Sequence, residues 1–194
     1  MDTTDTDGLD QADMERLVAG QDAALNALMQ RHGPGIFGFL YRMLGHEDDA
    51  NDLAQETFVR VFRARQSYQP GRKFSTWLFT IAANLARNHL RWRSRHPNVS
   101  LDAESETTEQ TLGDSLPTGA ASPDEAAETA ERANLVRRTV QRLPEDMREV
   151  LVLCEWEYRS VVEAAAILNI SPKAAESRLY RARQLLRERL AKWL

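Results

Sequence analysis

The chain has 194 residues, a formal net charge of −4 and a single cysteine, which excludes a disulfide framework within it. It contains no apolar run near the ~18 residues that cross a bilayer, and its acidic N-terminus has the wrong sign for a signal peptide. We therefore expect a cytoplasmic protein of one large domain or two small ones.

The charged residues are arranged in blocks, which the net charge of the whole chain does not show. Residues 1–59 sum to −9, residues 60–95 to +9, residues 96–131 to −9, residues 132–170 to zero and residues 171–194 to +5. The local field, rather than the total charge, decides what a surface attracts. Two basic blocks separated by an acidic one predict two binding modules joined by a tether.

The first third of the chain predicts helices joined by breaks. Residues 1–11 are acidic and lack periodicity, which predicts a disordered tail. Apolar residues recur at helical spacing from Ala12 to Met29, with Gly20 as a break. Gly33-Pro34-Gly35 is expected to interrupt or kink the chain, and the following apolar run ends at Gly45.

The next two predicted helices are amphipathic. The first runs from His46 to Gln66, and its acidic first turns favour the positive end of the helix dipole. A turn-rich loop follows from Ser67 to Arg72. Helix then resumes from Ser75 to Arg95.

The basic block of residues 60–95 holds nine positive charges, no carboxylate and six interspersed aromatic residues. Cations bind a phosphate backbone regardless of sequence, and exposed aromatic faces can stack on unpaired bases. This combination indicates a surface for a separated DNA or RNA strand. The alternative is a solvated basic helix whose aromatic residues belong to the core, and Trp77 in particular favours the core.

The second half is predicted to follow a linker. Pro97 to Asp124 contains no aromatic and no basic residue, a composition that cannot bury enough surface to fold. Helices return from Ala126: one reaches about Arg142, one opens at Leu143-Pro144, and a pair flanks Asn169. Because no strand pattern occurs anywhere, we expect an all-α fold.

The last pair of helices predicts a helix-turn-helix. Val161 to Leu168 is short and apolar, and Asn169 can adopt the left-handed turn conformation. Ser171 can cap the following helix, with Pro172 at its first position. The N-terminal side chains of that helix would reach base edges, and its later arginines would meet phosphates. An ordinary helical hairpin is the alternative.

Three stretches carry a family resemblance. They are His46 to Phe58, then Phe74-Ser75-Thr76-Trp77-Leu78 with Ile81-Ala82-Ala83-Asn84, and finally Ser171 to Arg183 with Leu185-Leu186-Arg187-Glu188. The first two resemble region 2, and the third the end of region 4, of the sigma-70 family in its small extracytoplasmic-function (ECF, group IV) subgroup.

The resemblance implies a domain organisation. After the tail of residues 1–11 it implies region 2 over residues 12–96, an acidic flexible linker over residues 97–127, and region 4 with its helix-turn-helix over residues 128–194. The fold it implies is two small helical domains.

The resemblance also implies a bacterial transcription initiation factor. Such a protein binds core RNA polymerase at the beta-prime clamp and the beta flap, recognises the −35 and −10 promoter elements, and helps to melt the promoter. The polymerase-binding residues it implies are Asp49, Asp52, Leu53, Gln55, Glu56, Phe58 and Val59. The residues implied at the −10 element are Tyr68, Arg72, Lys73, Phe74, Asn84, Arg87, Asn88, Arg91 and Trp92. The residues implied at the −35 element are Ser171, Lys173, Glu176, Ser177, Arg178, Tyr180, Arg181 and Arg183.

Some of these residues have simpler interpretations. Helix capping and core packing explain Leu53 and several of the acids. Asn88 stands where the family often carries an aspartate, and Glu176 stands where a lysine is frequent. Glu176 can accept a hydrogen bond from cytosine N4 or pair with Lys173, Arg178 or Tyr180 on its own helix.

The remaining expectations concern partners and chemistry. An anti-sigma protein that covers both DNA-binding regions is implied by the resemblance, and the linker carboxylates are hypothesised to imitate RNA inside the polymerase. The histidines lack metal-ligand spacing, and Cys154 is expected to be a small core residue, so no metal, no cofactor and no catalysis are predicted. The competing readings are a stand-alone helix-turn-helix regulator, which leaves the basic block without a purpose, and a helical enzyme, which lacks a catalytic constellation.

Overall fold

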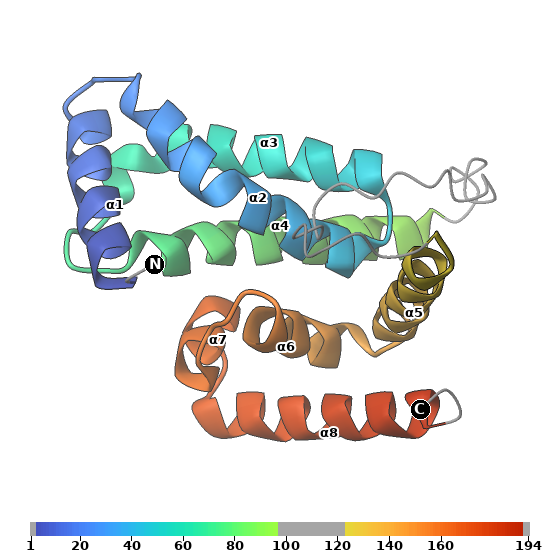
Figure 1. Ribbon diagram of the computed structural model, residues 1–194. Coiled ribbons are helices and arrows are strands. Elements are labelled where there is room, and N and C mark those ends of the chain that lie inside the picture. The colour runs from blue at the N-terminus through green and yellow to red at the C-terminus, as the bar shows by residue number, and fades with distance from the viewer. Residues whose placement is uncertain (1–2, 97–122, 192–194) are drawn as a thin grey trace.

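The computed structural model describes residues 3–96 and 123–191 of the chain. In these two ranges all regular structure is helical, which confirms the all-α expectation (Figure 1). The elements are α1 (Thr3–Val18), α2 (Ala24–Leu44), α3 (Glu47–Ala64), the 3-10 turn η1 (Arg65–Ser67), α4 (Phe74–Arg95), α5 (Pro123–Gln141), α6 (Glu145–Glu155), α7 (Val161–Leu168) and α8 (Pro172–Leu190). None of the described helices has the length and apolar character that a membrane span requires.

The N-terminal half is a four-helix unit. Helices α2 and α3 pack on each other and on α4, and α1 lies across one end of the group, beside α2 and the start of α4 (Figure 1). Its core consists of apolar side chains that recur at helical spacing, which is why the periodicity located these helices. Its large buried members include Met14, Leu17, Leu28, Ile36, Phe39, Leu40, Met43, Phe58, Phe74, Leu78 and Phe79.

The expectation of a disordered tail differs from the structure, because residues 3–11 form most of α1. Asp10 is almost fully buried and pairs with Arg31 and His32 of α2, while Asp13 pairs with Arg16 and Arg31. Burial raises the pKa of Asp13, but hydrogen bonds from Arg31 and Arg16 outweigh it, so the pKa lies below its ordinary value. The sequence shows that residues 1–11 are acidic, but it does not show that the partners of these acids lie on α2, about twenty residues further along the chain.

Helix α2 runs through Gly33-Pro34-Gly35 without interruption. Pro34 lacks an N–H group and forfeits one hydrogen bond of the helix, a loss that tertiary packing of this buried helix offsets. The predicted break at Gly20 and stop at Gly45 are both present. Gly45 has a φ of 77° and its N–H donates to the Tyr41 carbonyl over 2.8 Å.

The predicted linker falls mainly on residues 97–122, and both its flexibility and its imitation of RNA concern residues outside the described ranges. Residues 123–127, which the sequence assigned to the linker, belong to α5. Pro123 is the first helical residue, the position at which proline is favoured in a helix.

The C-terminal half contains the predicted helix-turn-helix. Asn169 adopts the left-handed conformation with a φ of 56°, and the Ser171 hydroxyl accepts a hydrogen bond from the Ala174 N–H over 3.2 Å. Helix α7 begins with a capping box that the sequence analysis did not identify, in which Ser160 and Glu163 satisfy each other's backbone N–H groups. The short positioning helix and the reading helix α8 are therefore held by local hydrogen bonds as well as by packing.

The two halves pack against each other. Helix α2 contacts α5 and α6, and α4 contacts α7, so that the C-terminal half lies along one side of the four-helix unit (Figure 1). The buried apolar residues of both halves join into one cluster. We call the polar contacts along this boundary the interdomain seam; they are Arg87–Glu149, Lys73–Glu163, Arg159–Ser75, Arg137–Tyr41 and Arg148 with the Met43 carbonyl.

Candidate nucleic-acid and polymerase interface

The outer face of α3 presents the exposed members of the predicted polymerase-binding set. Asp52, Gln55 and Val59 are exposed at one-turn intervals, and the Glu56 carboxylate accepts a hydrogen bond from Arg60 over 2.8 Å. An apolar residue at the centre of a charged rim suits a protein interface.

Three members of that set are placed differently. Phe58 is 4% exposed and belongs to the core, and Leu53 packs partly against it. Asp49 turns toward the end of α4, where it lies 3.2 Å from His89 Nε2 and 3.7 Å from an Arg93 nitrogen. Asp49 therefore joins α3 to α4, and Phe58 can act on a polymerase only by supporting the helix.

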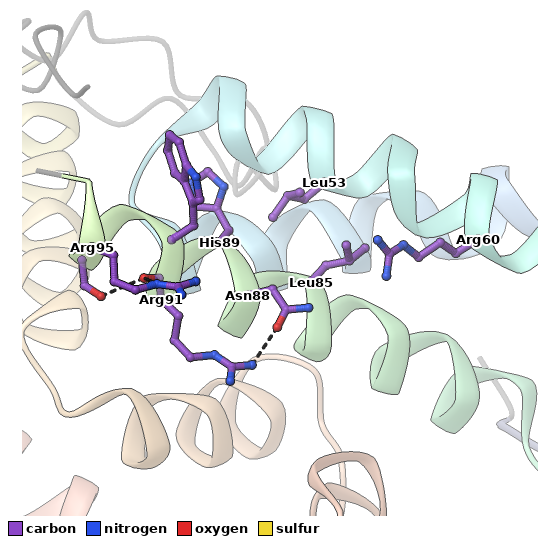
Figure 2. A pocket seen from close by; sticks show the side chains of 9 residues that line it. Leu53, Arg60, Leu85, Asn88, His89, Arg91 and Arg95 are labelled. Carbon is purple, nitrogen blue, oxygen red and sulfur yellow. Dashed lines mark hydrogen bonds between the residues drawn. The ribbon is translucent and has the colours of Figure 1, made fainter. Parts of the chain in front are cut away.

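The C-terminal part of α4 and the facing side of α3 form a groove of about 670 Å³. Figure 2 shows Leu53 and Arg60 of α3 facing Leu85, Asn88 and the last turns of α4. The lining residues combine guanidinium groups with an aromatic surface; they are Leu53, Arg60, Leu85, Asn88, His89, Arg91, Trp92, Ser94 and Arg95. Trp92 is 43% exposed although the His96 ring stacks on it with the ring centroids 4.9 Å apart, so only the exposed part of the indole is available to a base.

Asn88 and Arg91 act as a pair in this groove. The Arg91 guanidinium donates to the Asn88 Oδ1 over 2.7 Å (Figure 2). An aspartate at this position would bind the guanidinium as an ion pair, whereas the neutral amide keeps the positive charge available and retains its own N–H donors. The substitution therefore preserves a cationic groove with added hydrogen-bond donors.

A second, smaller groove of about 490 Å³ lies further along the same two helices. It is lined by Glu56, Arg60, Arg63, Ala64, Trp77, Ile81 and Asn84. Arg60 and Arg63 were counted in the basic block but were not assigned to the −10 set, and the structure places both next to Asn84. The basic block could have identified both arginines as site residues, because helical spacing puts residues 60 and 63 on one face of α3.

The loop before α4 is ordered by aromatic packing. The Tyr68 hydroxyl donates to the Arg72 carbonyl over 2.7 Å, and its ring lies 5.4 Å from Trp77 and 6.3 Å from Phe74. Phe74 is 1% exposed, so this predicted −10 residue lies in the core instead of at the DNA surface. Trp77 is half-buried against the same cluster, as its interpretation as a core residue predicted.

Two predicted DNA-binding cations are occupied by the C-terminal half. Arg87 Nε lies 2.6 Å from Glu149 Oε1, and Lys73 Nζ lies 3.1 Å from Glu163 Oε1 and 3.3 Å from Asp7. These pairs raise the pKa of Lys73 above its ordinary value, because the ammonium group donates hydrogen bonds to Glu163 and Asp7. By contrast, Arg72, Asn84, Asn88, Arg91 and Trp92 are all exposed.

Helix α8 exposes most of the predicted −35 set. Lys173, Glu176, Ser177, Tyr180 and Arg181 lie on its exposed surface. The expected pairs of Glu176 with Lys173, Arg178 or Tyr180 do not form among the described side chains, which leaves the carboxylate available to a base. Two arginines are paired instead within the C-terminal half: Arg178 Nε lies 3.4 Å from Asp146, and Arg183 lies 2.6 Å from Glu155. Ser171 acts as the N-cap.

Comparison with known protein families matches both halves. The family model described as Sigma-70 region 2 matches residues 28–96, and the model described as Sigma-70, region 4 matches residues 133–186. The grooves of α3 and α4 fall within the first match, and the helix-turn-helix falls within the second.

Individual relatives match over most of their length. The chain is 39% identical over 177 residues to the RNA polymerase sigma factor CarQ of Myxococcus xanthus, covering 91% of this chain and 95% of CarQ. It is 33% identical over 178 residues to the ECF RNA polymerase sigma factor SigW of Bacillus subtilis, covering 91% and 94%. Among solved structures, CnrH in complex with the cytosolic domain of CnrY matches with a TM-score of 0.70 and 28% identity, covering 95% of this chain and 98% of CnrH.

Proposed function

We propose, because this chain belongs to the extracytoplasmic-function group of the sigma-70 family and is a transcription initiation factor, that its two halves divide the promoter between them. The grooves between α3 and α4 hold the unpaired −10 strand, α8 reads the −35 duplex, and the outer face of α3 holds core polymerase. The stand-alone regulator is not favoured, since it leaves the match to region 2 unexplained.

The observation that carries the −10 role is the cationic groove of Figure 2, which joins Arg91 and Arg95 to an exposed Trp92. Guanidinium groups bind phosphates and the indole offers a stacking surface, so the groove suits a strand whose bases are unstacked. Unstacking a base costs a few kcal/mol, and binding of the extruded base offsets that cost. No hydrolysis is needed, so we propose that the chain acts by binding and not by catalysis.

The −35 role rests on the exposed side chains at the start of α8. In a helix-turn-helix the N-terminal part of the second helix enters the major groove. Lys173, Glu176 and Ser177 occupy that part, and Arg181 lies one turn later, where a phosphate contact is expected. Glu176, free of partners on its own helix, is suited to accept from cytosine N4.

A protein partner is also proposed. The structure of CnrH is a complex with the cytosolic domain of CnrY. We propose that an anti-sigma protein likewise covers the DNA-binding surfaces of this chain in the cytoplasm, where transcription takes place.

Run-off transcription tests the proposal. Core polymerase with this chain is expected to produce a transcript from a cognate promoter, and core polymerase alone is not. Arg181→Ala is expected to lower transcription from a promoter that has a −35 element. The exposed Arg138→Ala on α5 carries the same loss of charge and serves as the control. A stand-alone regulator would give no transcript with core polymerase and would still bind duplex DNA.

A further inference from the structure

The interdomain seam joins the cations of one DNA-binding half to the carboxylates of the other. Arg87 and Lys73 belong to the proposed −10 surface, and their partners Glu149 and Glu163 come from α6 and α7. A carboxylate accepts from a guanidinium or an ammonium group with nearly the same geometry as a phosphate oxygen. In the packed chain these two glutamates therefore occupy positions that a DNA backbone would need.

The contact at Arg87 is enclosed. The Glu149 side chain is 5% exposed and the Arg87 side chain 28%, so water reaches the pair only from one side. A phosphate cannot reach the Arg87 Nε while Glu149 holds it. Arg87 must therefore release Glu149 before this nitrogen can bind a phosphate.

The contact at Lys73 is exposed. Its side chain is 50% exposed and that of Glu163 28%, so this pair contributes little to stability and is screened by salt. It nevertheless sets α7 over the loop that precedes α4. Next to it the Arg159 guanidinium donates to the Ser75 hydroxyl over 3.1 Å and lies 4.8 Å from the centre of the Phe79 ring.

A close approach of the two halves is built into α2. A Cβ on Gly35 would lie 3.2 Å from Glu157 Oε2, and a Cβ on Gly38 would lie 3.8 Å from Glu157 Oε1. The absence of a side chain at Gly35 lets Glu157 lie close to α2, and the absence of one at Gly38 makes room for the Arg42 guanidinium, which a Cβ would approach to 2.7 Å. The seam is thus a fitted boundary with specific polar contacts, and not a chance apposition of two domains.

We propose that the C-terminal half is an intramolecular inhibitor of the strand-binding surface: Glu149 and Glu163 hold Arg87 and Lys73 in the free chain and must be displaced before the −10 strand binds. This inference rests on the proposed function of the −10 surface. Closure is partial, because Asn88, Arg91, Trp92 and Arg95 stay exposed beyond the seam. DNA can bind these exposed residues first and then compete with Glu149 for Arg87.

The charged contacts of the seam can be exchanged for others, whereas the apolar contacts that join the two halves oppose opening. Opening exchanges carboxylate partners for phosphates or water, so the charges keep partners in both states. Core polymerase favours opening to the extent that it binds the separated halves better than the packed ones.

The first test uses the full chain with Glu149→Lys and Glu163→Gln. The lysine at position 149 repels Arg87. The glutamine at position 163 removes the negative charge that pairs with Lys73 but can still form a capping box with Ser160. The control is Glu131→Lys with Glu188→Gln, two exposed positions in the same half, which changes the net charge equally. Affinity is measured by fluorescence anisotropy with a labelled 12-nucleotide single-stranded DNA.

The seam variant is expected to bind this probe about tenfold more tightly than the control variant, because two freed cations each gain a phosphate. Its radius of gyration in X-ray scattering should rise while its helical circular dichroism stays unchanged. If the variant stays folded but equals the control in affinity, or binds more tightly without expanding, the proposal is overturned.

The second test needs no substitution and decides the matter even if the seam variant fails to fold. A zero-length carbodiimide coupling should join Lys73 to Glu163 in the free chain, because their side chains lie 3.1 Å apart. Coupling of Lys73 to Asp7, at 3.3 Å within the N-terminal half, is the internal reference. The Lys73–Glu163 product should fall relative to the reference when core polymerase and the single-stranded probe bind. Its absence from the free chain, or its persistence in the polymerase–DNA complex, would overturn the proposal.

Failure of the proposed function looks different. If Arg87→Ala leaves transcription by the polymerase complex unchanged, the −10 role of Arg87 is wrong. If that variant loses transcription while the seam variant shows no gain over its control, the inhibitor inference alone is wrong.

Discussion

At the residue scale, chemical type and exposure have to be separated. Phe58 and Phe74 fit the expected binding motifs as well as Val59 and Trp92 do, yet the first two are buried and the last two exposed. Phe58 and Val59 are neighbours on α3, where one step along the helix turns the next side chain to a different side. The motifs identify residue types, but Phe74 shows that a motif residue can lie in the core.

This distinction predicts opposite phenotypes for two neighbours on α3. Phe58→Ala should lower the free energy of unfolding by about 3–5 kcal/mol, because it opens a cavity in the core. Asp52→Ala should leave that free energy within about 0.5 kcal/mol and weaken binding to core polymerase about tenfold. Thermal unfolding and a polymerase-binding titration measure the two effects. Equal loss of stability in both variants would show that α3 has no separate binding face.

A second residue-scale prediction concerns Tyr158, which is 88% exposed and has a φ of 51°. A non-glycine residue pays ~1–2 kcal/mol for this conformation, more than the ~0.5–1 kcal/mol that glycine costs in the unfolded chain. Tyr158→Gly should therefore raise stability by about 0.5–1 kcal/mol in chemical denaturation, whereas Tyr158→Ala, which keeps the strained φ, should not. A lower stability for the glycine variant would mean that the tyrosine ring stabilises the turn.

At the element scale, local signals were reliable and distant partners were not. The caps at Gly45, Asn169 and Ser171 lie next to the residues they serve, so the sequence predicted them and the structure has them. The helical state of residues 3–11 and the role of Glu149 depend on partners roughly 20 and 60 residues away. The amino-acid composition shows how many such charges the chain carries, but it does not show which of them form pairs.

The seam contains a carboxyl whose titration can be followed. Burial raises the pKa of Glu149 from 4.5 to about 7, although Arg87 of α4 and Arg178 of α8 counteract the shift and Glu145 of α6 adds to it. The pKa is higher in the packed state, so the stability contribution is complete below pH 4.5 and is lost as the pH rises through about 7. Burial similarly raises the pKa of Glu157 to about 7 against Arg42 and Arg159.

Raising the pH from 6 to 8 should therefore destabilise the packed state by about 1.4 kcal/mol through Glu149 alone. In Glu149→Gln the neutral amide keeps an acceptor for Arg87 and does not titrate, so urea denaturation should show a smaller change between these two pH values. The contrary result is an unchanged pH dependence in this variant, which would assign the titration to other groups.

At the scale of the whole molecule, the order of the parts could be predicted and their packing could not. The family models of region 2 and region 4 match residues 28–96 and 133–186, in the order that the motifs have along the chain. The charge blocks predicted two binding modules joined by a tether, but the fit of Glu157 against Gly35 depends on backbone geometry that no periodicity encodes. The chain is thus a transcription initiation factor in which the C-terminal half packs over part of the proposed −10 surface.

Promoter opening by the complete polymerase complex shows whether the α4 surface holds the unpaired −10 strand. Arg87→Ala with Arg91→Ala removes two cations from the α4 surface, and Arg138→Ala with Arg142→Ala removes two exposed cations from the C-terminal half as a control. Permanganate reactivity of unpaired thymines in the −10 region measures the bubble. The account predicts a loss of about tenfold or more for the α4 variant at equal polymerase binding and a normal bubble for the control; a normal bubble in the α4 variant would contradict it.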